Sequence, residues 1–336
     1  MLTVRLPALN ARLVNAEVDE PLAGPDDVLI RIEACGICHS DAHYRAGFGS
    51  IATPRTLGHE IAGTVITVGD RVREISAGDR VAVHYLRSCG TCRRCTRAGE
   101  QFCESGQMIG KHCDGGYADA IVVPARNAIP IPANVPMDVA AVMMCSTATA
   151  YHALRVANVQ PGNSLAILGL GGLGISALHL SRALGVEQIA AVDVVPEKLA
   201  AATALGARAV SPNDLLSATD GYGFDIAIDF TGNPDVALTA LRALAPRGTL
   251  VVVALSERAI TFNPYRDVLG PERRIVGCSD HLRGELFDLM ELASTGRLNL
   301  DAAISKRVPL EADAINDALD DLERGTGSMR SVIVKM

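Results

Sequence analysis

The amino-acid sequence predicts an α/β protein built of two domains, one a doubly wound parallel sheet and the other mainly β. Three observations support this prediction. The chain has 336 residues, more than a single hydrophobic core usually serves. Apolar residues make up 49% of it, which is ample for well-buried cores. The hydrophobic pattern also changes near residue 150, so each side of that point predicts its own architecture.

Residues 1–130 predict the β domain. They contain short alternating apolar runs, among them VLIRIEACG, EIAGTVITVG and DRVAVHY, separated by Gly, Pro and Asp. Alternation of this kind is typical of half-buried strands joined by turns. We therefore expect an antiparallel, partly barrel-like β domain in this part of the chain.

From Ser164 onward the pattern predicts a parallel sheet. Apolar strand candidates (SLAILG, QIAAVD, FDIAIDF, GTLVVVAL and RRIVGC) alternate with helical stretches such as ISALHLSRALG, PEKLAAATALGA and NPDVALTALRALA. Continuous apolar strands separated by helices indicate βαβ units whose sheet is covered on both faces. The last segment, EADAINDALDDLERG followed by SMRSVIVKM, predicts a helix and then a strand that returns to the first domain.

Charge and cysteine content narrow the possible functions. The chain carries 31 Lys and Arg against 38 Asp and Glu, and this acidic balance argues against a nucleic-acid partner. No basic stretch followed by an apolar run opens the sequence, and its longest apolar stretch, residues 165–180, is too short to span a membrane comfortably. Nine cysteines, an odd number without an export signal, favour a reduced cytoplasmic protein that uses thiolates on metal.

The run CGTCRRCTRAGEQFC predicts a structural zinc site. Its spacing is C-x2-C-x2-C-x7-C, and four thiolates so close in sequence can surround one ion tetrahedrally without leaving an open position. The alternatives are unmetallated thiols or an iron–sulfur cluster, whose bacterial ferredoxin spacing is similar but ends in C-x3-C-P. The four cysteines are Cys89, Cys92, Cys95 and Cys103.

A second, dispersed set of residues is a candidate catalytic metal site. Cysteine and histidine occur in ACGICHSDAHY, in TLGHEIAGTV and in AAVMMCSTATAYHAL. A Cys–His–Cys set would leave one of the four zinc positions free, as a catalytic zinc requires. Spacing alone leaves the matter open, because a lone cysteine or histidine is more often a packed residue than a ligand.

The strand SLAIL leads into a glycine-rich turn, Gly169-x-Gly171-x-x-Gly174, and a helical run follows. This context is typical of a Rossmann dinucleotide-binding turn, where a pyrophosphate lies at the helix N-terminus. Asp193 ends the next strand candidate, where a carboxylate accepts hydrogen bonds from ribose hydroxyls and repels a 2′-phosphate. NAD is therefore favoured over NADP. Asp193 could at the same time cap the helix that begins at Pro196.

The motifs CHSDAH, GHE, the four-cysteine run, CSTAT and GLGGLG occur in this order. Together they resemble the zinc-containing medium-chain dehydrogenase/reductase family, which includes liver and yeast alcohol dehydrogenases, over essentially the whole chain. The resemblance implies two Zn²⁺ per chain, one structural and one catalytic, with Cys38, His59 and Cys145 as the catalytic ligands. It also implies that Glu60 is a metal residue that lies behind the zinc and can exchange with or approach it, and that Asp41 orients the ligand histidine.

The resemblance further implies a proton relay. An alcohol has a pKa far above 7, and zinc lowers it, so a proton must leave a site that excludes bulk water. Ser40 both donates and accepts, and His43 takes a proton near neutral pH, so the two would pass it on through the cofactor ribose. The alternatives are a turn-capping hydroxyl for Ser40 and a solvent-facing loop residue for His43.

Several residues match family positions that contact the cofactor. His39 and Arg330 match positions near the pyrophosphate, Thr149 one near the nicotinamide, and Lys198 one near the adenosine ribose. The CSTAT segment departs from the family's C-A-G-x-T by having Thr147 in place of glycine. The complete set of expected cofactor-binding residues is His39, Thr149, Gly169, Gly171, Gly172, Leu173, Gly174, Asp193, Lys198 and Arg330.

The domains expected from this resemblance are a GroES-like catalytic domain (residues 1–146, completed by 282–336) and a Rossmann domain (residues 147–281), with the active site in the cleft between them. The expected activity is NAD-dependent oxidation of a primary or secondary alcohol, or reduction of the matching aldehyde or ketone. A polyol or threonine-type dehydrogenase is the alternative, and a non-enzymatic zinc- and nucleotide-binding sensor is disfavoured. We expect a homo-oligomer, with a tetramer favoured over a dimer.

Overall fold

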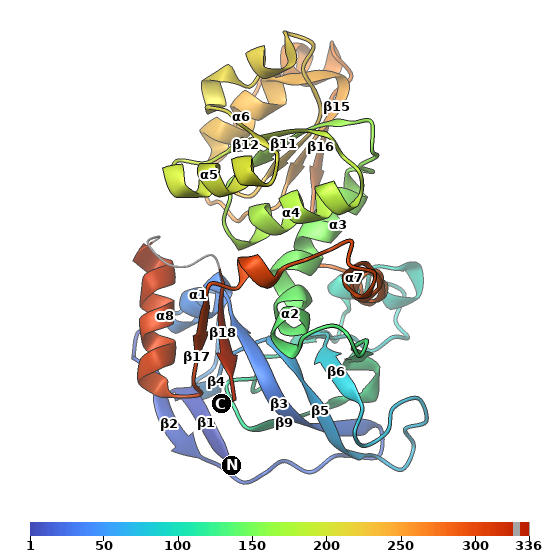
Figure 1. The fold of residues 1–336 in the computed structure, drawn as a ribbon, viewed down its shortest axis with the longest axis vertical. Helices are drawn as coiled ribbons and strands as arrows, with labels where there is room; N and C mark the ends of the chain where they lie inside the picture. Colours follow the sequence, from blue (N-terminus) through green and yellow to red (C-terminus); the bar gives the residue numbers. More distant parts are fainter. Residues whose placement is uncertain (325–329, 336) are drawn as a thin grey trace. The chain divides into compact units, whose positions relative to one another are not determined.

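The computed structural model describes residues 1–324 and 330–335, and the chain folds into two compact units (Figure 1). Unit 1 comprises Met1–Ala148 together with Leu282–Met336, and unit 2 comprises Thr149–His281. Each unit has its own cluster of buried apolar side chains. No helix among the described residues is long and apolar enough to cross a membrane.

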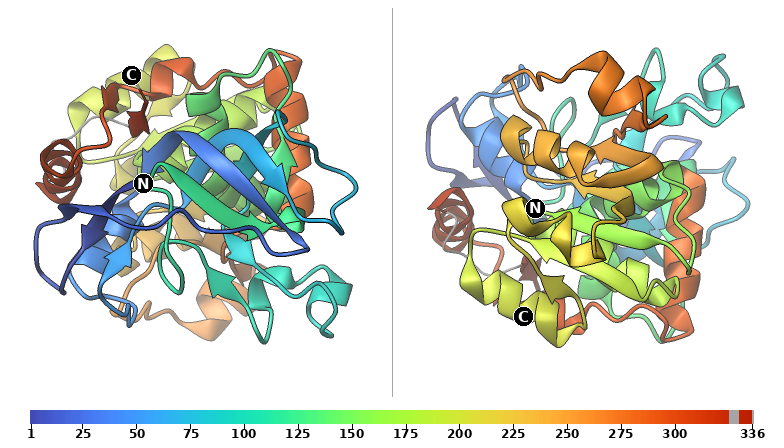
Figure 2. Two further views of the ribbon diagram at one scale, coloured as in Figure 1. Left: turned by 90° about the horizontal axis from the view of Figure 1, so that it is seen from below. Right: turned by 90° about the horizontal axis from the view of Figure 1, so that it is seen from above.

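A seven-stranded sheet forms the centre of unit 1 and is seen from a second direction in the left view of Figure 2. Six strands follow the order β10-β6-β5-β3-β18-β17, and β9 also pairs with β3. All pairs are antiparallel except β17 with β18. The strands are β3 (Asp27–Ile37), β5 (Glu60–Val68), β6 (Arg80–Val83), β9 (Ala120–Pro124), β10 (Ala128–Pro130), β17 (Lys306–Val308) and β18 (Ser331–Val334).

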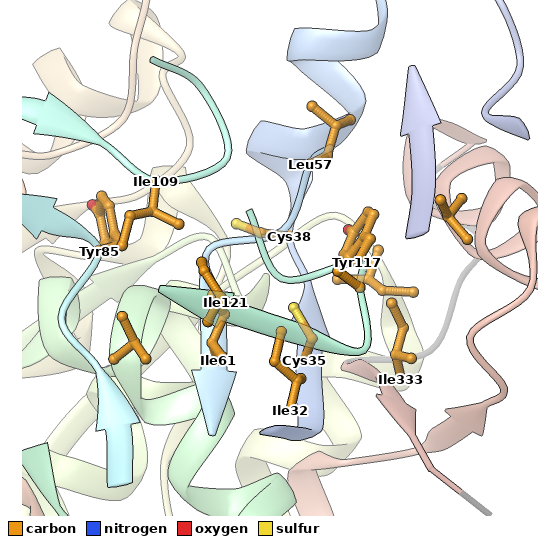
Figure 3. Packing of buried hydrophobic residues seen from close by; sticks show 14 of the residues in the cluster. Ile32, Cys35, Cys38, Leu57, Ile61, Tyr85, Ile109, Tyr117, Ile121 and Ile333 are labelled. Atoms are coloured by element: carbon orange, nitrogen blue, oxygen red, sulfur yellow. The ribbon is translucent and has the colours of Figure 1, made fainter. Parts of the chain in front are cut away.

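The C-terminal strand β18 pairs antiparallel with β3, so the end of the chain completes the sheet of unit 1. This sheet packs one face into an apolar core: Ile32 and Cys35 of β3, Ile61 of β5 and Ile121 of β9 lie together in Figure 3. The alternation of buried and more exposed side chains is clear only over residues 30–34 of β3, and most of the rest of this strand is buried on both faces.

Smaller elements surround this sheet. Two further sheets have the orders β2-β1-β4 and β7-β8. Their strands are β1 (Leu2–Leu6), β2 (Val14–Glu17), β4 (Arg55–Thr56), β7 (Leu86–Arg87) and β8 (Gln107–Met108). The helices of unit 1 are α1 (His39–Arg45), α2 (Met137–Val142), α7 (Arg283–Ser294) and α8 (Ala312–Arg324). A π-helical turn over Met143–Thr147 follows α2 directly and leads into α3 (Ala148–Val156).

Unit 2 is built on a six-stranded, wholly parallel sheet with the order β13-β12-β11-β14-β15-β16 (Figure 2, right view). The strands are β11 (Ser164–Leu168), β12 (Gln188–Val192), β13 (Arg208–Ala209), β14 (Phe224–Asp229), β15 (Leu244–Val252) and β16 (Arg274–Gly277). The helices α4 (Gly172–Ala183), α5 (Pro196–Ala204) and α6 (Pro234–Arg242) connect successive strands.

Numbered by their occurrence in unit 2, these strands lie in the order 3-2-1-4-5-6, which is the Rossmann arrangement. The chain reverses its direction of winding between β11 and β14, and ligands of such sheets bind beside the carboxyl ends of the strands at that point. The predicted fold class is confirmed. Of the six strands, β13 had no candidate segment in the sequence, because two residues are too few to make a hydrophobic pattern.

Candidate metal centres and cofactor site

Four chemically reactive side chains meet in unit 1 and form what we call the buried cluster: Cys38, His59, Glu60 and Cys145. One ligand atom from each lies within 4.8 Å of those of the others. Three separate segments deliver them. Cys38 is the N-cap of α1 directly after β3, His59 and Glu60 lie at the start of β5, and Cys145 lies in the π-helical turn. Such π turns occur frequently at functional sites.

The geometry of the buried cluster fits a zinc ion. The Sγ atoms of Cys38 and Cys145 are 3.9 Å apart, and Nε2 of His59 lies 3.3 Å from Sγ of Cys145. A tetrahedral zinc with metal–sulfur distances of about 2.3 Å would hold two thiolates about 3.8 Å apart. A hydrogen bond from Cys145 lowers the pKa of the Cys38 thiol well below its usual range, which favours the thiolate that a metal needs.

Glu60 is held at the edge of this cluster. Its side chain is fully buried, and Arg330 binds one carboxylate oxygen, Oε2. The other oxygen, Oε1, has no hydrogen-bond partner among the described residues, which is the condition expected of a group that serves a missing ligand. Burial raises the pKa of Glu60 to about 7, although Arg330 opposes this shift. Arg330 also donates to the hydroxyl of Ser146, next to Cys145.

Gly36 makes room for Glu60. The two residues are opposite each other on β3 and β5, and a Cβ at Gly36 would lie only 1.9 Å from Oε2 of Glu60. The carboxylate therefore lies over the backbone of β3 on its way to Arg330. A glycine here is required by close approach rather than by an unusual backbone conformation.

Asp41 lies behind His59 and is fully buried. Its Oδ1 atom is 3.3 Å from Nδ1 of His59 and accepts a hydrogen bond from the backbone N–H of Gly58. Its Oδ2 atom accepts from the backbone N–H of Cys38 and from the hydroxyl of Tyr117. Burial alone would lower the pKa of His59, but Asp41 and Cys38 raise it well above its usual value, so the ring is a stronger base.

The residues expected to relay a proton both lie on α1. Ser40 is half-buried, with its hydroxyl 3.8 Å from Sγ of Cys38. His43 is exposed and packs edge-on against His39 at 4.8 Å and against Phe48 at 5.8 Å between ring centroids. No hydrogen bond joins Ser40 and His43 among the described residues. Helical spacing nevertheless places side chains three positions apart on one face.

The second group of thiols, which we call the four-cysteine cluster, comprises Cys89, Cys92, Cys95 and Cys103. Sulfur–sulfur distances are 3.5 Å between Cys92 and Cys95, 3.9 Å between Cys89 and Cys95, and 4.0 Å between Cys92 and Cys103. These distances are far too long for disulfides and match the edges of a tetrathiolate zinc tetrahedron, about 3.8 Å. The four-cysteine cluster thus has the donors and the spacing of a closed structural site.

Local backbone groups stabilise the thiolates of this cluster. The backbone N–H groups of Thr91 and Cys92 donate to Sγ of Cys89 at 3.4 and 3.3 Å and lower the pKa of Cys89 to about 5. One side chain of the same loop reaches outward: Glu100 accepts a hydrogen bond from the backbone N–H of Arg283, at the start of α7, and lies 3.6 Å from Arg126. The loop is therefore attached to the body of unit 1 through Glu100.

In unit 2, the glycine-rich turn joins β11 to α4 at the switch point. Gly169 has a φ of +87°, which favours glycine, and a Cβ at Gly174 would lie 1.8 Å from the carbonyl oxygen of Gly169. Gly171 is the N-cap of α4, and a Cβ there would meet nothing within 4 Å. Gly172 and Leu173 begin the helix, so their backbone N–H groups belong to its first turn. This arrangement suits a pyrophosphate.

Asp193 follows β12 beside this turn. Its carboxylate accepts hydrogen bonds from the backbone N–H groups of Leu170, at 2.6 Å, and of Val195, at 2.9 Å. It therefore ties the glycine turn to the start of α5, where Val195 is the N-cap. Lys198 lies in the first turn of α5, and Thr149 lies in α3 and is half-buried.

Sequence reasoning missed four residues that hold these sites: Gly36, Glu100, Tyr117 and Ser146. Each acts on a partner that is distant in the chain, so no local spacing marks it. The one signal that could have drawn attention is the glycine pair before Tyr117, which allows its segment to pack closely against residues 57–58. Thr147, where the family has glycine, lies within the π-helical turn and is not among the residues with a positive φ.

Comparison with known proteins first defines the class. A model of the alcohol dehydrogenase GroES-like domain matches residues 24–133, and a zinc-binding dehydrogenase model matches residues 172–295. The two halves of the chain thus match the two domains of a zinc-binding dehydrogenase.

Individual relatives then define the family. The chain is 32% identical to an NAD-dependent alcohol dehydrogenase of Sulfolobus acidocaldarius, with 94% of each chain covered. It is 33% identical to an enzyme of the same name from Saccharolobus solfataricus, covering 99% of this chain and all of the relative. The structure superposes on the alcohol dehydrogenase of Aeropyrum pernix with a TM-score of 0.88 at 30% identity, over the full length of both. The chain belongs to the zinc-containing medium-chain dehydrogenase/reductase family and is of the alcohol dehydrogenase type.

Proposed function

We propose that this protein is an NAD-dependent alcohol dehydrogenase that transfers a hydride between a primary or secondary alcohol and NAD, and in reverse to the matching aldehyde or ketone. The observation that carries the proposal is the convergence of Cys38, His59 and Cys145 from three distant segments into one buried set of donors. Full-length relatives named NAD-dependent alcohol dehydrogenases support it.

The metal-binding roles follow from the donor atoms. Cys38, His59 and Cys145 would hold a catalytic zinc, and three protein ligands leave it one position for substrate. Bound there, Zn²⁺ would act as a Lewis acid toward the substrate oxygen and favour its deprotonation. Asp41 would keep the Nδ1 proton of His59, so that Nε2 presents its lone pair to the metal. Glu60, held by Arg330, would supply negative charge next to the ligands without leaving the site.

Proton removal would begin at Ser40. Its hydroxyl lies next to Cys38, and a hydroxyl can accept one proton while donating another. His43, exposed on the same helix, would be the group that exchanges the proton with solvent. Partial desolvation of the ring and the neighbouring His39 lower the pKa of His43, which keeps the ring neutral and able to accept a proton at neutral pH. The absence of a direct Ser40–His43 contact among the described residues is consistent with a relay that uses the cofactor ribose.

Unit 2 would bind the cofactor. NAD accepts the hydride that leaves the alcohol carbon. The first turn of α4 would bind its pyrophosphate, and Asp193 would accept hydrogen bonds from the ribose hydroxyls. His39, Thr149, Lys198 and Arg330 are the further contacts that we propose. Tyr85, whose ring lies 5.1 Å from that of His59, would line the substrate site.

The proposal also includes a cellular compartment and an oligomeric state. We propose that the protein works in the cytoplasm, because both clusters depend on cysteines that stay reduced. We also propose a homo-oligomer, with a tetramer favoured. The last strand of the unit 2 sheet, β16, supports association, because Ile275 on this strand is exposed and large apolar side chains at Tyr265 and Leu269 are exposed as well.

A panel of alcohols and carbonyl compounds, assayed with NAD and with NADP by nicotinamide absorbance, tests this function. We expect turnover of apolar primary or secondary alcohols with NAD and a marked preference for NAD over NADP. Turnover restricted to polyols or to amino-acid alcohols would redirect the substrate class. No turnover of any alcohol by protein that contains two zincs would contradict the proposal.

A further inference from the structure

Asp41, which lies beside the buried cluster, accepts hydrogen bonds from several parts of unit 1. It is fully buried and accepts three hydrogen bonds, from the backbone N–H groups of Cys38 and Gly58 and from the hydroxyl of Tyr117, while Nδ1 of His59 lies 3.3 Å from its Oδ1. A carboxylate is an acceptor only, so each of the three hydrogen-bonding groups donates to Asp41. Two of these donors belong to the segments that carry metal ligands. Tyr117 is the exception, because it lies in the loop before β9.

Tyr117 is held rigidly. Its backbone N–H donates to the carbonyl of Leu57 at 3.0 Å, and its own carbonyl accepts from the N–H of Val4 at 2.8 Å. Its ring packs on Gly58, where a Cβ would lie 2.4 Å from the ring. The side chain is fully buried beside Cys35 in the core (Figure 3). The hydroxyl therefore has a fixed position, with Oδ2 of Asp41 at 2.9 Å.

We propose that Tyr117 is a positioning residue for the catalytic metal site, acting through Asp41 on His59. The Tyr117 hydroxyl and the Cys38 N–H hold Oδ2, which sets the rotation of the carboxylate and so places Oδ1 opposite Nδ1 of His59. That contact keeps the proton on Nδ1 and leaves Nε2 for the metal. This inference rests on the proposed zinc site and adds to it a residue outside the ligand set.

The chemistry predicts a specific effect for loss of the hydroxyl. Water cannot replace the hydroxyl of Tyr117, because the residue is fully buried. Without this donor, Asp41 would be free to rotate about its side-chain bonds, and the orientation of the His59 ring would be less well defined. Mutation of a residue that contacts a metal ligand typically lowers metal affinity by about 10–100-fold. Tyr117 contacts such a residue and not a ligand, so we expect its loss to lower the affinity by about 3–10-fold.

Tyr117→Phe is the test variant, since it removes the hydroxyl and keeps the ring. Zinc affinity is measured in the purified holoenzyme by competition with a chromophoric chelator, which resolves the two zincs of each chain. We expect the zinc of the buried cluster to bind about 3–10-fold more weakly in the variant, and the affinity of the four-cysteine cluster to be unchanged.

Thr3→Val is the matched control. It also removes a buried hydroxyl from unit 1, that of Thr3, which bonds Thr56 at 2.9 Å, and Thr3 pairs with Ala118 beside Tyr117. It touches neither Asp41 nor His59, so we expect unchanged affinity for both zincs. If Tyr117→Phe and this control weakened zinc binding at the buried cluster equally, Tyr117 would contribute only to the stability of the fold. That result would overturn the proposal.

A double-mutant cycle with Asp41→Asn tests the route of the effect. If Tyr117 acts through Asp41, Tyr117→Phe changes zinc affinity much less in the Asp41→Asn background than in the wild type. The visible spectrum of the cobalt-substituted protein should shift in Tyr117→Phe and not in Thr3→Val. Additive effects on affinity, or an unchanged cobalt spectrum, would overturn the proposal. Wild-type protein with a single zinc would instead contradict the proposed function, so the two failures are distinguishable.

Discussion

The two thiol-rich clusters of unit 1 are built in opposite ways. The four-cysteine cluster comes from residues within one loop, is partly exposed, and is stabilised by the backbone of that loop. The buried cluster joins Cys38 to Cys145 over 107 positions, lies in the interior, and depends on Asp41, Tyr117 and Arg330 from elsewhere in the fold. The first cluster can form once its loop closes. The second exists only when the sheet and the π-helical turn are in place.

Because of this difference, the two clusters suit different roles for a bound zinc. Four thiolates complete the coordination of a zinc and leave no position for substrate, so the four-cysteine cluster can only hold a loop. The buried cluster has two thiolates, one imidazole and a carboxylate that Arg330 already engages on one oxygen. Its stability therefore depends on long-range packing, and its chemistry on an incomplete set of ligands.

The largest effect is expected for Cys38→Ala. Loss of this thiolate removes a ligand from the buried cluster, and turnover of alcohols should fall by on the order of 10³-fold or more, because the Lewis acid is lost or misplaced. Elemental analysis should find one zinc per chain instead of two, while the melting temperature changes little. Full turnover by Cys38→Ala would show that the buried cluster is not the catalytic site.

Cys92→Ser should have the reverse profile. Removing one thiolate from the four-cysteine cluster should lower the melting temperature by several degrees, because structural metal binding contributes to folding free energy. The loop of residues 89–103 should become sensitive to protease. The zinc of the buried cluster should remain, and kcat per active site should stay within about threefold of wild type. A loss of turnover as large as that of Cys38→Ala would contradict the division of roles.

Gly36→Ala tests how closely the buried cluster depends on its surroundings. A Cβ at this position would lie 1.9 Å from Oε2 of Glu60, so the carboxylate must move away from Arg330. Overpacking of this kind costs about 1–3 kcal/mol, and we expect a loss of about 5–100-fold in kcat/KM with the four-cysteine zinc unaffected. Gly277→Ala is the control, because a Cβ there meets nothing within 4 Å. If both variants lost the same fraction of kcat/KM, the effect of Gly36→Ala could not be assigned to displacement of Glu60.

Glu100→Ala should have the smallest effect. It removes the contact between the loop of the four-cysteine cluster and the start of α7, where Arg283 donates its backbone N–H to Glu100. We expect a loss of about 1 kcal/mol in the free energy of unfolding, measured by chemical denaturation, since a partly buried backbone donor loses its partner. Turnover should change by less than about twofold. A large loss of turnover would mean that the two clusters are coupled through α7.

The same contrast explains what could be predicted from sequence. Spacing was sufficient for Cys89, Cys92, Cys95 and Cys103, because close ligands in one loop need no tertiary information. The fold class and the family were also predicted, since five ordered motifs and the βαβ pattern extend along the chain. Both were then confirmed. The short strand β13 had no pattern of its own and was missed.

The buried cluster could not be derived from spacing, and its ligands were expected only from the family resemblance. The structure brings Cys38, His59, Glu60 and Cys145 together, and their roles stay proposals. Ser146 could not be anticipated, and for Tyr117 the only signal was the glycine pair before it. Each contacts its partner across a large sequence separation (Asp41 for Tyr117, Arg330 for Ser146), and such contacts are set by strand register and by the π-helical turn rather than by any local motif.

The most direct test of the central claim is to follow zinc content and NAD-linked alcohol oxidation together while a chelator removes metal from the wild-type protein. We predict two zincs per chain at the start, and activity that falls to zero in step with the loss of the zinc of the buried cluster, whose three protein ligands would leave a position that a chelator can occupy, while the four-cysteine zinc remains bound. Activity that persists until the four-cysteine zinc is removed, or protein that holds only one zinc when fully active, would contradict it.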